Sequence, residues 1–89
     1  MNQMKWKIEW HPNAANNLEK LPNRIKDAAI KRIDKLQDNP FHFLEHYEGQ
    51  DFYKFRAGDY RALVDVDFEN NTIKIQVFDH RKRIYKRIK

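Results

Sequence analysis

The 89-residue chain contains no cysteine and has only two glycines and three prolines. The lack of cysteine excludes disulfide bonds, thiol catalysis and thiolate metal sites. No apolar stretch approaches the roughly 20 residues that a membrane-spanning helix needs, and the N-terminus lacks the apolar run of a signal peptide. We therefore expect a soluble, cytoplasmic protein with no membrane partner.

The chain also lacks internal repeats and any linker rich in serine, glycine or proline. Its length is at the small end of what folds alone, so we expect one domain over residues 1–89. A chain of this size buries only about 60–65% of its unfolded surface. Its stability in the absence of a partner is therefore expected to be modest.

Positive charge exceeds negative charge, and the excess is concentrated near the C-terminus. The chain has 18 Lys and Arg against 13 Asp and Glu, for a net charge of +5. Residues 80–89 contain six of the basic side chains and no acidic one. Such a cluster attracts a polyanion or an acidic protein partner, although a solvated basic tail has the same composition.

The first half of the chain predicts a strand followed by two helices. Residues 4–10 alternate between apolar and polar side chains, which is typical of a strand with one buried face. Residues 12–38 have apolar residues at helical spacing, with Pro12 suited to a first helical turn and Pro22 separating two helices. Residues 41–49 fit no regular pattern, and we expect a loop there that could include a short strand.

The second half predicts strands joined by tight turns. Residues 52–57, 60–67 and 73–79 alternate in polarity, and Gly58-Asp59 and Asn70-Asn71 have the composition of turns. We therefore predict an α+β fold: an N-terminal strand, a two-helix hairpin, and an antiparallel meander of three to four strands. The helices are expected to cover one face of the sheet.

The alternation also predicts which side chains share a face of the meander. Apolar side chains such as Phe55, Ala62 and Ile75 are expected to face the helices. The opposite face is expected to carry mostly basic and polar side chains: Lys54, Arg56, Arg61, Lys74, Gln76 and Phe78. The segment 80–85 follows the last strand beside this face. The result is a basic surface with one histidine and no pair of carboxylates, on which a phosphodiester could bind.

Three segments resemble the RelE branch of the RelE/ParE toxin superfamily. They are Tyr53-Lys54-Phe55-Arg56, Gly58-Asp59-Tyr60-Arg61 and Val77-Phe78-Asp79-His80-Arg81-Lys82-Arg83-Ile84-Tyr85. The likeness extends over nearly the whole chain, since the preceding strand and helical hairpin follow the family's order. It implies a RelE-like fold and a toxin of a type II toxin–antitoxin pair. The implied activity is cleavage of messenger RNA in the ribosomal A site, by 2′-hydroxyl transesterification without a metal or other cofactor.

The resemblance also implies roles for individual residues. Lys54 corresponds to a basic residue proposed to abstract the proton, if neighbouring arginines lower its pKa. Arg61 and Arg81 correspond to arginines that stabilise the phosphate, and Arg81 also lies near the leaving group. Tyr85 corresponds to a terminal tyrosine that stacks on a base or orients the hydroxyl.

Other positions depart from the family pattern or leave alternatives open. Arg56 replaces a lysine of well-known members, and because arginine stays protonated we expect it to bind phosphate. Lys74, Arg83 and Lys86 are expected to contact RNA in the same way. His80 has the side chain best suited to acid–base catalysis near neutral pH, but a histidine at a strand end can equally be structural.

Two histidines at helical spacing, His42 and His46, lack a third ligand, so no metal site is expected. Asp79 stands where many relatives have glycine. Its carboxylate could pair with Arg81 and weaken phosphate binding, or it could orient His80.

The resemblance further implies a small cognate antitoxin of the RelB type, a 70S-type ribosome and messenger RNA as partners. An acidic and apolar antitoxin segment that folds on binding is expected to mask the basic face. The alternative function is that of a ParE-like toxin, which inhibits DNA gyrase without catalysis on a similar fold.

Overall fold

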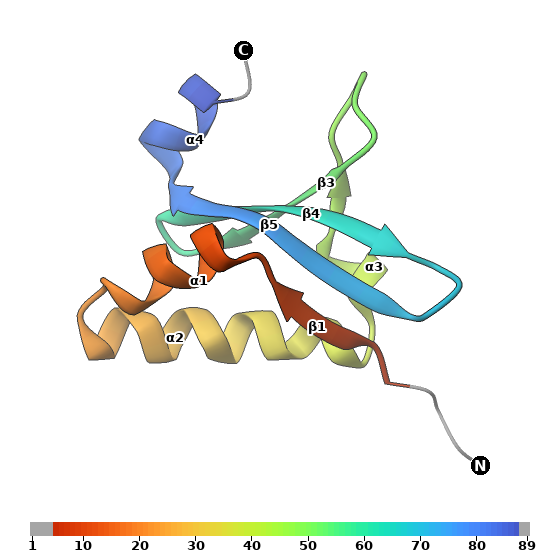
Figure 1. Ribbon diagram of the computed structural model, residues 1–89, viewed down its shortest axis with the longest axis horizontal. Helices are drawn as coiled ribbons and strands as arrows, with labels where there is room; N and C mark the ends of the chain where they lie inside the picture. Colours follow the sequence, from red (N-terminus) through yellow and green to blue (C-terminus); the bar gives the residue numbers. More distant parts are fainter. Residues whose placement is uncertain (1–4, 88–89) are drawn as a thin grey trace.

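The computed structural model describes residues 5–87, and the side chains of residues 5–84. Its strands form one sheet in the order β1-β5-β4-β3-β2. Helices α1 and α2 lie together on one side of the sheet, and α4 rises from the end of β5 away from them (Figure 1). The elements are β1 (Lys7–Trp10), α1 (Pro12–Glu19), α2 (Asn23–Asp34), the 3₁₀ turn η1 (Lys35–Gln37), α3 (Pro40–Phe43), β2 (Glu45–His46), β3 (Tyr53–Ala57), β4 (Tyr60–Asp67), β5 (Thr72–His80) and α4 (Arg81–Arg87).

The predicted fold class and element order are confirmed. Strands β2 to β5 form the antiparallel meander, while β1 adds to its far edge in parallel with β5. The loop expected at residues 41–49 contains the short strand β2, but the single helical turn α3 and the C-terminal helix α4 were not predicted. None of the described helices is long and apolar enough to cross a membrane.

Helix α1 begins at Pro12 because the preceding residue caps it. Nδ1 of His11 accepts a hydrogen bond of 3.1 Å from the backbone N–H of Asn13, which has no partner within the helix. Ala14 and Leu18, four residues apart, are buried on the same side of the helix. This stripe packs against β5, which lies between β1 and β4 in the sheet.

The turn between β4 and β5 forms as its composition predicts. Asn71 adopts a positive φ of 48°, a conformation that asparagine tolerates better than most residues. The carboxylate of Asp67 accepts hydrogen bonds from the side chain and backbone of Asn70 and from the backbone N–H of Glu69. These bonds, chiefly those from Asn70, hold the pKa of Asp67 below its usual value. The carboxylate form of Asp67 therefore stabilises the turn.

Strand β5 contains a β-bulge that changes which residues face the helices. Leu63 pairs with Val77 but Val64 pairs with Ile75, so that Gln76 is an extra residue in β5. The residues of β5 that face the helices are therefore the odd-numbered ones before Gln76 and the even-numbered ones after it. Phe78, which the sequence placed on the basic face, is 0% exposed.

The prediction for Phe78 is wrong because an unbroken alternation cannot anticipate an inserted residue. Its ring lies in the main core, stacked on Tyr60 at 5.5 Å between ring centroids and edge-on to Trp10 at 5.7 Å. Aromatic pairs in these geometries stabilise a core beyond their buried area. Phe78 therefore connects β5 to both β1 and β4.

Replacing Phe78 by alanine tests this placement. We expect Phe78→Ala to lower the free energy of unfolding by about 3–5 kcal/mol, because it leaves a cavity in the core. Gln76→Ala, at the bulge itself, removes only an exposed hydrogen bond to Asp65 and should cost no more than about 0.5 kcal/mol. Urea unfolding followed by circular dichroism measures both; equal effects would contradict the bulge.

Candidate nucleic-acid interface

Strands β3 and β4 bring three predicted cationic residues together. Lys54, Arg56 and Arg61 line a shallow hollow of about 20 Å³, which they share with Glu45 and Phe55. Such a volume holds about one water molecule. The hollow therefore provides cationic groups for an anion but no deep pocket for a base or a sugar.

Two arginines of the hollow face each other across the β3–β4 ladder. Arg56 lies directly opposite Arg61 in the register, an arrangement in which like charges repel. The guanidinium of Arg61 donates hydrogen bonds to the carbonyl oxygens of Gly58 (2.6 Å) and Tyr60 (2.9 Å). Arg56 is exposed, and its guanidinium makes no hydrogen bond or ion pair with another described side chain. A bound phosphate would relieve the repulsion between them.

Strand β2 and the residue that follows it contribute two side chains that the sequence did not single out. Glu45 lies directly opposite Lys54 in the β2–β3 register, which places one carboxylate in the cationic hollow. The ammonium nitrogen of Lys54 lies 5.4 Å from the centre of the Tyr47 ring, within cation–π range. A strand of two residues is too short to give a period-two signal, so pattern reasoning missed both Glu45 and Tyr47.

The end of β5 is tied to the turn between β3 and β4. Gly58 and Asp59 form a two-residue turn in which Gly58 has a positive φ of 66°, as a type II′ hairpin requires. The backbone N–H of Arg81 donates a 2.8 Å hydrogen bond to the carbonyl oxygen of Asp59. His80 lies opposite Tyr60 in the register, with ring centroids 5.4 Å apart. The structure thus brings His80 and Arg81 to the strand end that carries Arg61, but the His80 ring lies on the helix-covered face with Tyr60 and not on the basic face of Arg61, as the sequence had suggested.

His80 has a structural role in the observed fold. Its Nδ1 accepts a hydrogen bond of 3.2 Å from the backbone N–H of Lys82 and so caps α4. Because Nδ1 accepts this bond, the ring proton of the neutral imidazole lies on Nε2. The structure therefore leaves Nε2 as the nitrogen with which His80 can act on a ligand.

Asp79 is buried, with 5% of its surface exposed. Its carboxylate accepts the backbone N–H of His80 at 2.8 Å and lies 3.6 Å from the guanidinium of Arg83. The hydrogen bond ties this carboxylate to the backbone at the end of β5. Arg83 lines a separate hollow with Asn17 of α1 and with Lys20 and Leu21, and none of the three cations of β3 and β4 lines it.

The other predicted contacts are not gathered at the hollow. Lys74 lies opposite Asp65 and Glu9, and it lines a shallow depression beside Trp10. Tyr85 and Lys86 belong to α4, and their side chains lie outside the described ones. Helix α4 is held to the sheet by Ile84, which is 1% exposed although it lies outside the main core.

Comparisons with known proteins agree with this architecture. Residues 8–85 match the family model described as the ParE toxin of the type II toxin–antitoxin system parDE. The chain is 32% identical over 89 residues to RelE4 of Methanocaldococcus jannaschii, covering 94% of this chain and 95% of that protein. It is 31% identical over 87 residues to toxin RelG of Mycobacterium tuberculosis, covering 94% and 100%.

A solved structure matches at the level of the fold as well. The toxin–antitoxin complex RelBE2 of Mycobacterium tuberculosis contains a chain that superposes with a TM-score of 0.76 and 28% identity, covering 90% of this chain and 95% of that one. These matches define the class of the protein as the toxins of type II toxin–antitoxin systems. More particularly, the chain belongs to the RelE/ParE toxin superfamily, as its sequence motifs indicated.

The cationic hollow can be tested by the salt dependence of RNA binding. We expect Arg56→Gln to weaken binding of a short single-stranded RNA and to lower the slope of log affinity against log salt by about 0.7–1, because one phosphate contact is lost. Fluorescence anisotropy of a labelled RNA at several salt concentrations measures the slope. Lys31→Gln is the matched control, since Lys31 is exposed on α2 outside the hollow. An identical change in both variants would mean that only net charge matters.

Proposed function

We propose that this toxin is a ribosome-dependent endoribonuclease that cleaves messenger RNA in the A site. The observation that carries the proposal is that Lys54, Arg56 and Arg61 share one hollow, and that the backbone of Arg81 is tied to the turn next to Arg61. Cleavage of a phosphodiester needs a base, positive charge around the phosphate and a donor for the leaving oxygen. Each of these groups has a candidate side chain at this end of the sheet.

In the proposed reaction, the ribose 2′-hydroxyl loses its proton and its oxygen attacks the adjacent phosphorus. The bond from phosphorus to the 5′-oxygen breaks, which leaves a 2′,3′-cyclic phosphate and a 5′-hydroxyl. Glu45 and Lys54 lie opposite each other in the β2–β3 register, and one of them accepts the proton of the 2′-hydroxyl. Arg56 and Arg61 bind the non-bridging oxygens, whose negative charge increases in the transition state.

The departing 5′-oxygen must receive a proton or a strong hydrogen bond. His80 can present Nε2 while its Nδ1 caps α4, and the Arg81 side chain is exposed beside it. We assign the protonation of the leaving group to Arg81 or His80; the His80 ring lies beside Tyr60 on the helix-covered face, so it would have to reach the phosphate around the end of β5. Tyr85 would orient the RNA, and Lys74, Arg83 and Lys86 would contact RNA outside the reacting phosphate.

The proposal includes the ribosome because the hollow alone is poorly suited to orient RNA. Correct orientation of reacting groups can account for several kcal/mol of a reaction barrier, and a hollow of about 20 Å³ cannot enclose a nucleotide. A 70S-type ribosome with messenger RNA in its A site would supply the further contacts that orient the RNA. The protein would then act in the cytoplasm, where translation takes place.

A small RelB-like antitoxin is the second proposed partner. The Mycobacterium tuberculosis structure that resembles this chain is a complex of toxin and antitoxin. An antitoxin with an acidic segment would compete with RNA for the cationic hollow by charge. Neutralisation would then require no change in the fold of the toxin.

Cleavage in a translating extract tests the proposed activity. We expect the wild-type protein to cleave messenger RNA, and Arg81→Ala and Lys54→Ala each to slow cleavage by about 10²-fold or more, because each removes a group that acts in the transition state. Primer extension on the message measures cleavage, with Lys31→Ala as the variant of an exposed lysine outside the site. Unchanged activity in both Arg81→Ala and Lys54→Ala would contradict the site.

Conservative variants show which of Glu45 and Lys54 acts as the general base. Glu45→Gln keeps the size of the side chain but cannot accept a proton, and Lys54→Arg keeps the charge but stays protonated. The variant that loses activity identifies the base. Full activity in both would remove this pair from the mechanism.

Gyrase inhibition is the second candidate function, because the matching family model is that of the ParE toxin. ParE-like action would need no RNA cleavage. A DNA supercoiling assay distinguishes the two functions with the same protein preparation. Inhibition of gyrase together with an intact message would replace the endoribonuclease proposal with this one.

A further inference from the structure

Two aromatic side chains beside the cationic hollow have no role in the proposed reaction. Tyr47 directly follows β2 and Phe52 directly precedes β3. The backbone N–H of Tyr47 donates a 2.9 Å hydrogen bond to the carbonyl oxygen of Phe52, which continues the β2–β3 ladder by one further pair of residues. The two rings lie against each other, with their centroids 5.2 Å apart. We call them the Tyr47–Phe52 pair.

The Tyr47–Phe52 pair lies on the same face of the sheet as the cations. Residues two positions apart in a strand point to the same face, so Tyr47 shares the face of Glu45, and Phe52 shares that of Lys54. In Figure 1 the loop between β2 and β3 rises from the sheet on the side away from α1 and α2. The pair therefore extends the surface that contains the cationic hollow.

Lys54 connects the aromatic pair to the hollow. Its ammonium nitrogen lies 5.4 Å from the centre of the Tyr47 ring, and the same side chain lines the hollow with Arg56. Within the described part of the chain, this ammonium group makes no ion pair with Glu45, although Glu45 lies opposite it in the register. A phosphate bound by Lys54 would therefore have an aromatic ring beside it.

A tight turn fixes the position of the Tyr47 ring. The backbone N–H of Gln50 donates a 3.0 Å hydrogen bond to the carbonyl oxygen of Tyr47, and Gly49 between them has a positive φ of 80°. A positive φ at the third residue of a four-residue turn is the requirement of a type II turn, which glycine meets without strain. The ring is thus held in place before any ligand binds, which lowers the entropy cost of binding.

An aromatic surface beside a cation suits a nucleotide as ligand. Nucleobases stack on aromatic side chains while cations bind the phosphates of the same strand. Both rings of the pair are partly exposed, whereas the cationic hollow, with a volume of about 20 Å³, cannot enclose a base. Aromatic residues that face each other across a hairpin also stabilise it. That role alone does not require a place on the cationic face.

We infer that the Tyr47–Phe52 pair is a stacking subsite for a nucleobase of RNA, next to the phosphate that Lys54 binds. The choice of RNA as the ligand rests on the proposed function, whereas the position of the rings beside Lys54 does not. Stacking accepts every base, because each base has an aromatic face. The subsite would therefore add affinity without reading the sequence.

The subsite would also orient the ribose beside the reacting phosphate. Phe52, Lys54 and Arg56 follow one another at every second position of one strand, which is a step of roughly 7 Å along the sheet. A base on the rings and a phosphate on Lys54 would hold a nucleotide at two points. The sugar between these points, with its 2′-hydroxyl, would then have little freedom to turn, which favours reaction.

RNAs that lack single bases test the inference on the wild-type protein. The probe is a labelled single strand of about five nucleotides, with 2′-O-methyl riboses so that it cannot undergo the proposed cleavage. Companion strands each have one abasic nucleotide at a different position, which removes a base but keeps every phosphate. Fluorescence anisotropy with the full-length toxin gives the affinities. We expect at least one abasic strand to bind about fivefold more weakly, or worse, than the intact strand.

Protein variants locate the stacked base. We expect Tyr47→Leu and Phe52→Leu each to weaken binding of the intact strand by about fivefold or more. The slope of log affinity against log salt should stay the same, because no phosphate contact is lost. Tyr47→Phe keeps the ring and should bind within about twofold of the wild type.

A matched control removes an exposed ring elsewhere. Phe68 is 61% exposed and lies against Trp6 and Phe41, and it does not line the cationic hollow. Phe68→Leu should therefore change RNA affinity less than about twofold. Circular dichroism checks that each variant keeps the fold. In the wild-type protein, the ring proton signals of Tyr47 and Phe52 should shift as RNA is added, with those of Phe68 unchanged.

Four results would overturn the inference. They are equal binding of the intact strand and all abasic strands, unchanged affinity in both Tyr47→Leu and Phe52→Leu, an equal loss in Phe68→Leu, and a loss in Tyr47→Leu that comes with a lower salt slope. The last result would mean that the ring acts only by placing Lys54.

Message cleavage in the translating extract is measured separately, so that the two proposals can fail independently. If the wild-type protein leaves the message intact but binds RNA through the Tyr47–Phe52 pair, the activity proposal fails and the subsite stands. If the message is cleaved and Phe52→Leu binds and cleaves RNA as the wild type does, the subsite fails and the activity proposal stands.

Discussion

The structure depends above all on the β-bulge at Gln76. Before it, β5 presents Ile73 and Ile75 to the helices, and after it the strand presents Phe78. This change of register sets His80 opposite Tyr60, so that the start of α4 meets the turn between β3 and β4. An unbroken strand would turn Phe78 toward solvent and rotate His80 to the other face. One inserted residue therefore determines both the core and the position of the candidate site.

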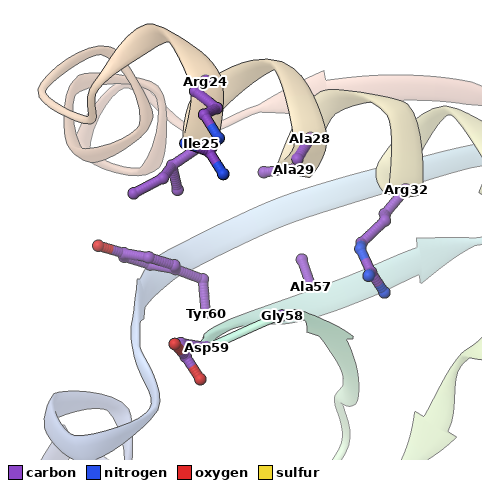
Figure 2. Close-up of a pocket in the computed structure, with 9 residues that line it drawn as sticks. All are labelled: Arg24, Ile25, Ala28, Ala29, Arg32, Ala57, Gly58, Asp59 and Tyr60. Carbon is purple, nitrogen blue, oxygen red and sulfur yellow. The ribbon is translucent and has the colours of Figure 1, made fainter.

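The turn between β3 and β4 is the point at which the two surfaces of the toxin meet. Its carbonyl oxygens hold the Arg61 side chain and the backbone of Arg81, and Gly58 and Asp59 also line a hollow beside α2 (Figure 2). A two-residue hairpin with glycine at the required positive φ is rigid enough to serve both. The same few residues therefore border both the strand that carries Arg61 and the hollow beside α2.

Much of the fold was predictable from the sequence, because long segments with clear periodicity dominate it. Prolines marked where helices begin, and alternation located β3, β4 and β5. The assignment of faces failed at Phe78, since period two carries no sign of a bulge. Part of the candidate site was also predictable, because Lys54, Arg56 and Arg61 lie on a regular hairpin. The position of Glu45 was not predictable, because a strand of two residues has no alternation to detect. The helix cap made by His80 was not predictable either, because it depends on the position of α4.

Titration of the wild-type toxin with a short single-stranded RNA, followed by NMR, tests the account most directly. RNA is expected to bind the sheet face at the end of β3, β4 and β5. We therefore predict shifts in the signals of Lys54, Arg56, Arg61 and Arg81, with the methyl signals of Ile25 and Ala28, which line the hollow beside α2, unchanged. Shifts confined to Ile25 and Ala28, with Lys54, Arg56 and Arg61 unaffected, would contradict this placement of the RNA site.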